Sequence, residues 1–355
     1  MSARIRSIEV ATPAATLTRA RWIELAKRLA PKGVAGGVIE RLAERSGIDR
    51  RSSAATPEEG DGLYADAAGE VTPRETPGTA ARMRLWRETA FSMAAEASSR
   101  AIERSGLAAR TITHCITASC TGYESPGIDA RLVEELGMDR GCRRLNIGHM
   151  GCHAAVNALA SARDAVLADP SARVLVCCTE VSSAHFQHSA RMDRLVANAI
   201  FADGCAAAVI DADGDGPELA AVATTLIPGT ADEMRWTVGD HGFEMTLGAR
   251  VPDILQGTVG PWARGVLTAN GLDTADVGGW AIHPGGPRVL DAVRDALRLP
   301  PSADEHSRAV LREHGNMSSA TLLFILRRLR EAGVPRPWVG LAFGPGLVGE
   351  MVLVR

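Results

Sequence analysis

The chain of 355 residues is close to neutral, with 39 Lys and Arg against 42 Asp and Glu and a formal charge of −3. Hydrophobic residues make up 46% of it and charged residues 23%, which excludes a disordered, collagen-like or coiled-coil protein. The near-neutral charge gives no electrostatic case for nucleic acid or an acidic membrane as the main partner. At about 100–200 residues per domain, this length predicts two domains or one large α/β unit.

Strands and helices are expected to alternate through the first half of the chain. The run over 173–179 is continuously apolar, which is typical of a strand buried on both faces of a sheet. Residues 53–80 are polar and rich in Gly, Pro and Glu, which predicts a surface loop. The other expected elements are strands over 5–12, 112–119 and 205–210, an extended segment over 144–147, and helices over 18–30, 88–105, 128–136 and 152–168.

The second half repeats this alternation after a break over 211–217, where the sequence DADGDGP is a strong loop signal. We therefore expect two domains, residues 1–211 and residues 217–355. Alternation in both halves predicts an α/β layered fold with buried sheets. The expected elements here are strands over 219–226, 278–282, 338–343 and 350–354 and helices over 252–269, 287–297, 303–314 and 318–332.

The cysteine pattern and the lengths of the apolar runs indicate the cellular compartment of the protein. The seven cysteines form no C-x-x-C pair, which is typical of reduced intracellular thiols and not of a disulfide framework. Residues 1–19 lack the apolar segment of a signal peptide. The longest apolar runs are far shorter than the ~20 residues that a membrane span needs. We expect a soluble, cytoplasmic protein that binds neither nucleic acid nor membranes.

Three residues stand where α/β folds place active sites. Cys152 is expected at the start of a helix, where backbone N–H groups and the helix dipole favour a thiolate. His283 follows a short strand in His-Pro-Gly-Gly, and Asn316 lies in a break between two helices. A nucleophilic thiol, an imidazole partner and an amide donor form a coherent catalytic set. Taken singly, each also fits a structural role, as a buried packing thiol, a loop histidine or a capping amide.

Two other motifs carry a weaker signal. His149, Cys152 and His153 have the spacing of zinc ligands, but the sequence offers no second Cys/His group that would complete a site. Residues 344–349 match G-x-G-x-x-G, yet Pro345 lies inside the turn and no βαβ unit surrounds it, so a dinucleotide site is not expected. We expect Gly344 and Pro345 to form a rigid loop between the last two strands, lining a pocket.

At these motifs the sequence resembles the type III polyketide synthases, the chalcone and stilbene synthase family. The likeness extends over most of the chain after about residue 40. Its strongest segments, in chain order, are residues 151–152 (GC), 174–180, 201–204 (FADG), 280–286 (WAIHPGG), 315–320 (GNMSSA) and 343–346 (FGPG). The resemblance implies a thiolase-like layered αβαβα fold built from two similar halves.

The resemblance implies that Cys152 accepts the acyl group and that His283 and Asn316 are its partners. His283 would hold the thiolate as an ion pair, and both partners would donate hydrogen bonds to the enolate that forms when a malonyl-type thioester loses CO2. The implied substrates are coenzyme A thioesters, an acyl-CoA starter and a malonyl-CoA-type extender, used by a homodimer without a metal or redox cofactor. Three alternatives stay open: a ketoacyl synthase-like enzyme that condenses once, a weakly active relative that transfers acyl groups without repeated extension, and a papain-like thiol hydrolase, which has the same Cys, His, Asn order.

The resemblance also implies roles for residues around the cysteine. Phe201 and Met245 match two gatekeepers between the cysteine and the CoA tunnel, with a flexible Met in place of a second aromatic residue. Arg45 and Arg51 match a basic stretch that contacts CoA phosphates. Ser125 stands where many relatives place a methionine that crosses the dimer interface. The residues implied to line the elongation cavity are Thr121, His185 and Ser318, and the other six cysteines are expected to be buried packing residues.

Overall fold

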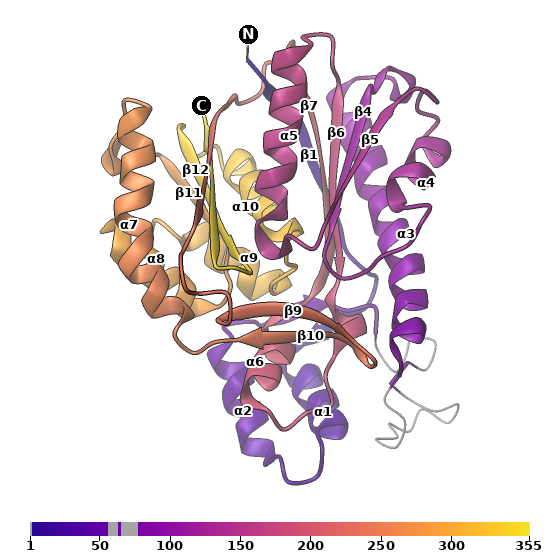
Figure 1. The fold of residues 1–355 in the computed structure, drawn as a ribbon, viewed down its shortest axis with the longest axis vertical. Coiled ribbons are helices and arrows are strands. Elements are labelled where there is room, and N and C mark those ends of the chain that lie inside the picture. Colours follow the sequence, from indigo (N-terminus) through magenta and orange to yellow (C-terminus); the bar gives the residue numbers. More distant parts are fainter. Residues whose placement is uncertain (1, 56–62, 65–76) are drawn as a thin grey trace.

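The computed structural model describes residues 2–55, 63–64 and 77–355. Over these residues the chain forms stacked layers in which helices and sheets alternate (Figure 1). The predicted α/β layered class is therefore confirmed. Most of the loop expected over 53–80 lies outside the described residues.

The first sheet has the strand order β1-β7-β6-β4-β5. β6 (Val174–Val181) lies at its centre, antiparallel to β7 (Asp203–Asp211) and parallel to β4 (His114–Ser119). β1 (Arg4–Ala11) and β5 (Arg143–Gly148) form its edges. Every residue of β6 and β7 is buried, because helices cover both faces of these strands.

The second sheet has the order β11-β12-β13-β8. β12 (Trp338–Gly344) runs parallel to β11 (Gly279–Ile282) and antiparallel to β13 (Val348–Val354), and β8 (Leu219–Leu226) forms an edge. Because β11 and β12 are parallel, their carboxyl ends open at the same edge of the sheet. His283 follows one of these ends directly, which is a position typical of α/β active sites.

Helices fill the space between the two sheets and cover their outer faces (Figure 1). α5 (Ala154–Ala168) and α10 (Ala320–Glu331) lie between the sheets and contact β6 and β7. α9 (Glu305–His314) packs against α10 and β11. The outer helices are α3 (Thr79–Ser105) and α4 (Ile128–Glu135) beside the first sheet and α7 (Val251–Ala269) and α8 (Pro287–Leu297) beside the second.

Several shorter elements gather below the sheets in Figure 1. Of these elements the sequence analysis predicts only the helix α1. It misses the other two helices and all four strands. They are β2 (Thr16–Thr18), α1 (Arg19–Leu29), α2 (Gly36–Arg45), β3 (Arg50–Ser52), α6 (Met192–Ile200), β9 (Met234–Gly239) and β10 (Gly242–Leu247).

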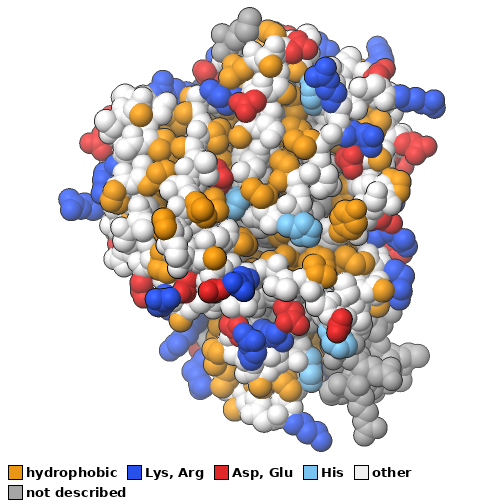
Figure 2. All heavy atoms as spheres, in the orientation of Figure 1, with side chains coloured by type: hydrophobic (Ala, Val, Ile, Leu, Met, Phe, Trp, Pro, Cys, Tyr) orange, Lys and Arg blue, Asp and Glu red, His pale blue; other side chains and the backbone are white. Residues whose placement is uncertain are grey.

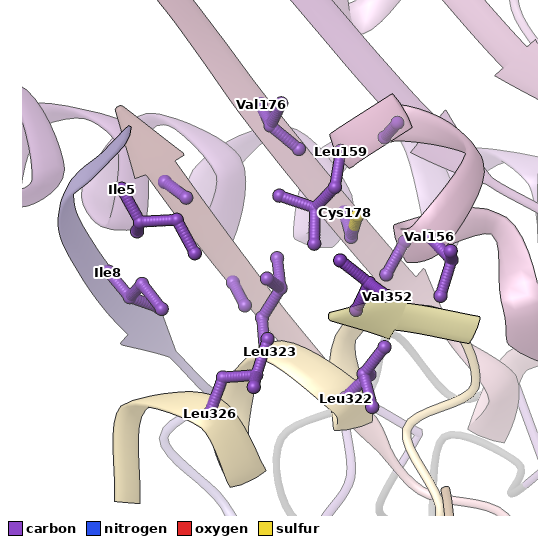
Figure 3. Close-up of a cluster of buried hydrophobic side chains, with 14 of the residues drawn as sticks. Ile5, Ile8, Val156, Leu159, Val176, Cys178, Leu322, Leu323, Leu326 and Val352 are labelled. Atoms are coloured by element: carbon purple, nitrogen blue, oxygen red, sulfur yellow. The ribbon is translucent and has the colours of Figure 1, made fainter. Parts of the chain in front are cut away.

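The central core forms where α5 and α10 pack between the sheets. Figure 3 shows labelled side chains of α5, α10, β1, β6 and β13 pointing toward one another, among them Leu159, Leu323 and Val176, which are fully buried. Burying one such side chain contributes about 1.5–3 kcal/mol. This packing fixes α5, and with it the turn that carries Cys152.

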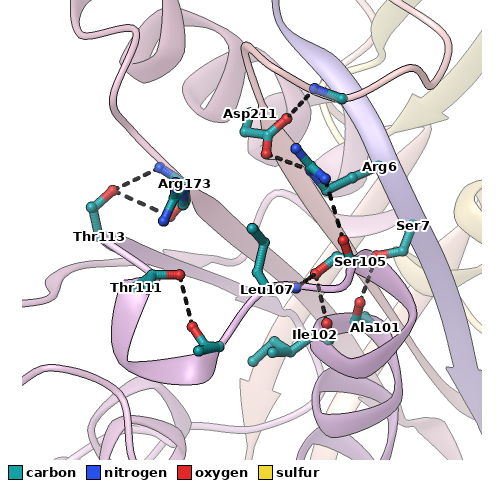
Figure 4. A network of polar contacts seen from close by, with 12 residues as sticks. Arg6, Ser7, Ala101, Ile102, Ser105, Leu107, Thr111, Thr113, Arg173 and Asp211 are labelled. Carbon is teal, nitrogen blue, oxygen red and sulfur yellow. Dashed lines mark hydrogen bonds and ion pairs between the residues drawn. The ribbon is translucent and has the colours of Figure 1, made fainter.

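Polar contacts tie β1 and the end of β7 to α3 (Figure 4). The Arg6 Nε donates to Asp211 Oδ2 at 2.5 Å, and the Ser7 hydroxyl donates to the carbonyl of Ala101 at 2.6 Å. At the end of α3, Ser105 Oγ accepts a hydrogen bond from the backbone N–H of Leu107 at 3.2 Å. These bonds hold the outer helix layer against the edge of the first sheet.

Among the helix starts that differ from the prediction, those of α3 and α5 have a clear structural reason. α3 begins at Thr79 and not at 88, because Arg82 belongs to its buried face: its guanidinium donates to the carbonyls of Ala184 and Phe186. An arginine reads as a surface residue in the sequence, so the pattern hides this first part of the helix. α5 begins at Ala154, after a 3₁₀ turn over Gly151–His153 that holds Cys152.

The surface of the described residues is mixed in character. On the face shown in Figure 2, hydrophobic side chains spread across the middle and charged side chains lie mostly around the rim. No helix in the described ranges has both the length and the apolar character needed to cross a membrane.

Candidate active site

Cys152 lies in the tight turn between β5 and α5. The preceding Gly151 has φ +73°, and a Cβ there would meet the Pro345 ring at 2.6 Å. Only glycine therefore fits both the left-handed backbone and the close approach of the Gly344–Pro345 loop. Cys152 itself is 6% exposed, so its thiol lies in an enclosed site.

Ser318 links the Cys152 thiol to a second buried thiol. The Ser318 hydroxyl lies 3.6 Å from Cys152 Sγ and 3.2 Å from Cys120 Sγ. The sequence analysis treats Cys120 as packing, but it lines the same cavity as Cys152. The sequence around Cys120 (CTGY) gives no sign that this thiol lies near Cys152. Their closeness depends on how the end of β4 and the loop before α10 meet in space.

Asn316 is held so that its amide N–H groups face Cys152. Its side-chain oxygen accepts the backbone N–H of Ser318 at 2.8 Å, and its own backbone N–H donates to the carbonyl of Ile200 at 3.0 Å. The amide nitrogen is thereby left to donate, and its hydrogen bond to Cys152 lowers the pKa of the thiol. The structure thus brings the predicted Cys152 and Asn316 together.

His283 lies at the carboxyl end of β11, and its backbone N–H donates to the carbonyl of Leu341 at 2.7 Å. The residue is 1% exposed, and neither ring nitrogen has a hydrogen-bond partner within the described ranges. Burial lowers the pKa of His283 to about 3, and the charge of the nearby His153 adds to this effect. The ring is therefore neutral at physiological pH, with one nitrogen that donates and one that accepts.

The expected preference of Cys152 for the thiolate is opposed by its surroundings. Burial raises the pKa of the Cys152 thiol to about 12; the Ser318 and Asn316 hydrogen bonds lower it, and the charge of Glu180 raises it further. Cys152 lies in a 3₁₀ turn before α5 and not in the first turn of that helix. The thiol must pass its proton to a base when it reacts.

Two hollows lie in the region of Cys152. One of 10 Å³ is lined by Cys120, Thr121, Cys152, Ser318 and Pro345, among others. The second, of 50 Å³, extends toward α1 and is lined by His185. Four residues border both hollows and lie between them, namely Ser182, Phe201, Trp236 and Met245. The gate positions implied by the resemblance, Phe201 and Met245, therefore lie next to the Cys152 thiol.

His185 and Thr121 are held by hydrogen bonds in the wall of these hollows. His185 Nε2 donates to the carbonyl of Thr121 at 2.6 Å, and Nδ1 accepts the backbone N–H of Phe243 at 2.9 Å. Both ring nitrogens are thus used by a neutral ring, whose pKa burial lowers to about 4. The Thr121 hydroxyl donates to Glu180 Oε2 at 2.7 Å. These two residues shape the cavity and are not placed to react.

Trp236 is a site residue that the sequence analysis misses. Its indole N–H donates to the carbonyl of Cys120 at 2.5 Å, and its ring packs against His185 and Phe243 at centroid distances of 5.6 and 5.9 Å. Trp236 belongs to β9, an element that the sequence pattern does not reveal. The only sign in the sequence that Trp236 belongs to a site is that an aromatic residue stands in an otherwise polar segment.

We expect the substitution Trp236→Ala to merge the two hollows and admit longer acyl groups. Because the indole separates them, its removal should raise kcat/KM for a long-chain starter relative to a short one by about tenfold, the effect of a few methylene contacts. Competition between two acyl-CoA starters measures this ratio. Trp262→Ala, a half-buried tryptophan of α7 outside both hollows, is the control and should leave the ratio unchanged.

Arg45 lies at the mouth of a larger open cavity of 650 Å³. The side chains of Arg191 and Arg288 lie at the same mouth, and its walls reach Met234 and Gly286, close to the loop that follows His283. All three arginines are exposed. Asp193 also lines the cavity and pairs with Arg191 at 2.7 Å, so the three arginines leave a net positive charge there that fits a phosphate-bearing substrate.

Arg51 does not reach this cavity, which corrects the expected CoA contact. Its guanidinium is buried and donates to the carbonyls of Ala199 at 2.6 Å and Phe201 at 2.9 Å, and it stacks on Trp22 at 4.9 Å. Burial lowers the pKa of Arg51 to about 9. The residue fixes the end of α6 and the backbone of Phe201, and its donors are directed away from solvent.

We expect Arg51→Ala to destabilise the fold by about 3 kcal/mol, because it leaves buried carbonyls at the end of α6 without donors. Urea unfolding at neutral pH measures this loss. The exposed neighbour Arg50 provides a matched control, and Arg50→Ala should change the free energy of unfolding by less than about 0.5 kcal/mol. Equal effects of the two substitutions would contradict the structural role of Arg51.

A buried thiol that faces an amide donor, with a neutral imidazole at a neighbouring strand end, is the chemistry of an acyltransferase that forms a covalent thioester. Family models agree with this class. The model of the N-terminal domain of chalcone and stilbene synthases matches residues 6–214, and that of the C-terminal domain matches residues 218–355. The chain belongs to the chalcone and stilbene synthase family.

Individual relatives and solved structures extend this result. The chain is 36% identical to a 1,3,6,8-tetrahydroxynaphthalene synthase from Streptomyces peucetius subsp. caesius, covering 76% of this chain and 74% of that protein. It is 31% identical to a 3,5-dihydroxyphenylacetyl-CoA synthase from Streptomyces toyocaensis, covering 91% and 84%. The crystal structure of PKS-I from the brown alga Ectocarpus siliculosus superposes with a TM-score of 0.94 at 29% identity, covering 100% of this chain and 98% of that one.

The enzyme is thus a type III polyketide synthase, a condensing acyltransferase with a thiolase-like fold of two halves. The resemblance found in the sequence is confirmed. The papain-like alternative is wrong, because both family models match and the fold is that of the condensing enzymes.

Proposed function

We propose that Cys152 accepts an acyl group from an acyl-CoA starter and that a malonyl-CoA-type extender lengthens it. The observation that carries this proposal is the Asn316 amide, which is fixed by Ser318 so that its N–H groups face the Cys152 thiol. The open cavity at Arg45 supports the entry of a CoA thioester from the surface.

In the loading step the Cys152 S–H bond breaks and the proton moves to the neutral His283 ring. The sulfur attacks the thioester carbonyl, the carbon–sulfur bond to CoA breaks, and the CoA thiolate takes the proton from the imidazolium. Because burial lowers the pKa of His283, the ring is neutral at rest and one nitrogen has a free lone pair that can take the proton, although the same burial makes it a weak base. The same low pKa makes the imidazolium a strong acid that readily protonates the leaving thiolate.

In the condensation step the extender loses CO2 and leaves an enolate that needs hydrogen-bond donors. The Asn316 amide and the N–H of His283 provide them, and one such donor is typically worth about 3–4 kcal/mol in the transition state. The carbanion then attacks the acyl carbonyl on Cys152, a carbon–carbon bond forms, and the Cys152 thiolate leaves. The chain, two carbons longer, now resides on the CoA of the extender.

The narrow hollow at Cys152 supports a small starter. A volume of 10 Å³ holds about one water molecule, and Trp236 and Phe201 close its far side. A small hollow also limits how far the acyl chain can grow, so it favours few condensations. An enzyme that condenses only once is therefore the second candidate function.

A panel of acyl-CoA starters of increasing length, each incubated with malonyl-CoA, tests the proposal. We expect products from the shortest starters, identified by mass, with a count of added two-carbon units that separates one condensation from several. Products only from long-chain or bulky starters would contradict the small-starter assignment. A complete lack of products with every starter would contradict the proposed reaction.

We also propose a homodimer that works in the cytoplasm. β5 is an edge strand, and large apolar side chains on it and beside it are exposed: Tyr123 by 70%, Leu145 by 45% and Met150 by 39%. Ser125 is exposed in the same region. Leu145→Arg should convert the dimer into a monomer in light scattering, and an unchanged mass would contradict this interface.

A further inference from the structure

Three large side chains among the residues that border both hollows form what we call the gate: Phe201, Trp236 and Met245. Trp236 and Met245 stand directly opposite each other on β9 and β10. Phe201 directly follows α6, and its ring centroid lies 6.3 Å from that of Trp236. The width of the gate therefore depends on what holds the β9–β10 hairpin against α6, which lies next to it in Figure 1.

The Gln187 side chain contacts one end of this hairpin. Gln187 is 8% exposed and lies between the 3₁₀ turn Ser182–His185 and α6. Its Nε2 lies 3.0 Å from the carbonyl oxygen of His185, 3.3 Å from that of His241 and 3.2 Å from that of Phe243. Carbonyl oxygens only accept hydrogen bonds, so the amide nitrogen must face them, and its two N–H groups serve all three. One side chain thus joins the 3₁₀ turn to the start of β10.

Asn198 of α6 holds the backbone of Gln187. The Gln187 N–H donates to Asn198 Oδ1 at 3.0 Å, and Asn198 Nδ2 donates to the Gln187 carbonyl at 2.8 Å. Arg51 links Asn198 to the gate, because its Nη1 donates to the carbonyls of Asn198 at 3.3 Å and Phe201 at 2.9 Å. One connected set of hydrogen bonds therefore runs from Phe201 to the strand that carries Met245.

Side-chain contacts, and not a larger sheet, hold the β9–β10 hairpin. Over the described part of the chain, β9 and β10 form a separate two-stranded sheet, which is only marginally stable by itself. The Phe243 N–H donates to His185 Nδ1 at 2.9 Å, and Glu244 forms an ion pair with Arg194. These contacts keep the hairpin attached when the Gln187 amide is removed, so its loss should shift the gate without unfolding it.

We propose that Gln187 is a positioning residue that sets the width of the gate, and thereby the length of acyl chain that can extend from Cys152 into the second hollow. Its contacts draw the start of β10 toward the 3₁₀ turn, and Asn198 fixes the same segment to α6, so the gate is held narrow. Because Gln187 also borders the second hollow, the test must distinguish an effect through the gate from direct contact with the acyl chain. This inference rests on the proposed function, in which Cys152 carries the acyl group.

The ratio of kcat/KM for hexanoyl-CoA to that for acetyl-CoA, each measured with malonyl-CoA, tests the proposal. Gln187→Met keeps the length of the side chain and removes the amide donor, and it should raise this ratio about threefold, mainly through a lower KM for hexanoyl-CoA. In an enzyme that already carries Trp236→Ala, the same substitution should leave the ratio unchanged, because the gate is already open. Gln256→Met, at an exposed glutamine of α7, is the matched control and should not change the ratio.

An unchanged ratio in folded Gln187→Met would overturn the proposal. So would an equal rise with and without Trp236→Ala, which indicates direct contact with the acyl chain, or a lower kcat for both starters at the same ratio, which indicates a purely structural amide. If Gln187→Met fails to fold, Asn198→Ala decides: it should raise the ratio in the same way, and an unchanged ratio there contradicts the proposal. Failure of the proposed function would appear separately, as a wild-type enzyme that forms no product with either starter.

Discussion

Cys152→Ala should lower the rate of condensation by about 10⁴-fold or more, because the substitution removes the sulfur that faces both Asn316 and Ser318. Product formation from an acyl-CoA starter and malonyl-CoA, followed by mass, measures this rate. The fold should survive, since the change leaves only a small space in a rigid turn.

A second substitution at this position separates the two steps of the reaction. Cys152→Gln has no nucleophile but places an amide carbonyl where the acyl carbonyl would lie, so it should release CO2 from malonyl-CoA without forming condensed products. Cys142→Ala, at a buried cysteine before β5, is the control and should keep wild-type condensation. Full condensing activity in Cys152→Ala would contradict the assignment of the nucleophile.

Asn316→Ala should lower the rate of malonyl-CoA decarboxylation by about 10²–10³-fold, because the enolate loses a donor worth several kcal/mol in the transition state. The loss should appear mainly in kcat, since the amide acts on charge that develops during the reaction. Release of CO2 from malonyl-CoA measures this step without the complication of product analysis.

The control for this prediction is Asn270→Ala, a partly exposed amide at the end of α7 whose side chain donates to the carbonyl of Val266. Its decarboxylation rate should equal that of the wild type. An Asn316→Ala enzyme that decarboxylates normally while its Tm falls would show that the amide only supports Ser318 and the backbone around it.

The three proposed catalytic residues could be named from the sequence because each belongs to a short local motif. Gly151-Cys152, the His-Pro-Gly-Gly turn at His283 and the Gly-Asn-Met-Ser-Ser segment at Asn316 carry both the reactive group and the glycine that its backbone needs. The layered fold was likewise readable from the alternation of buried strands and helices. The division of the chain at 211–217 stays a prediction.

Features that depend on side-chain direction were not open to prediction. Arg51 and Arg45 look alike in the sequence, yet one guanidinium is buried against carbonyls of α6 and the other lies at a surface cavity. Trp236 and Cys120 reach the site only because β9 and the loop after β4 meet there. Gln187 reads as an ordinary polar residue in the sequence, and its contacts to α6 and β10 join elements that are far apart in the chain.

The most direct test of this account is to locate the acyl group on the enzyme. The wild-type protein is incubated with a short acyl-CoA, quenched in acid, digested, and each cysteine peptide is weighed. The account predicts the acyl mass on the peptide that contains Cys152, and unmodified peptides for the other six cysteines, Cys120 included. An acyl group on a different cysteine, or product formation while Cys152 stays unmodified at every time point, would contradict it.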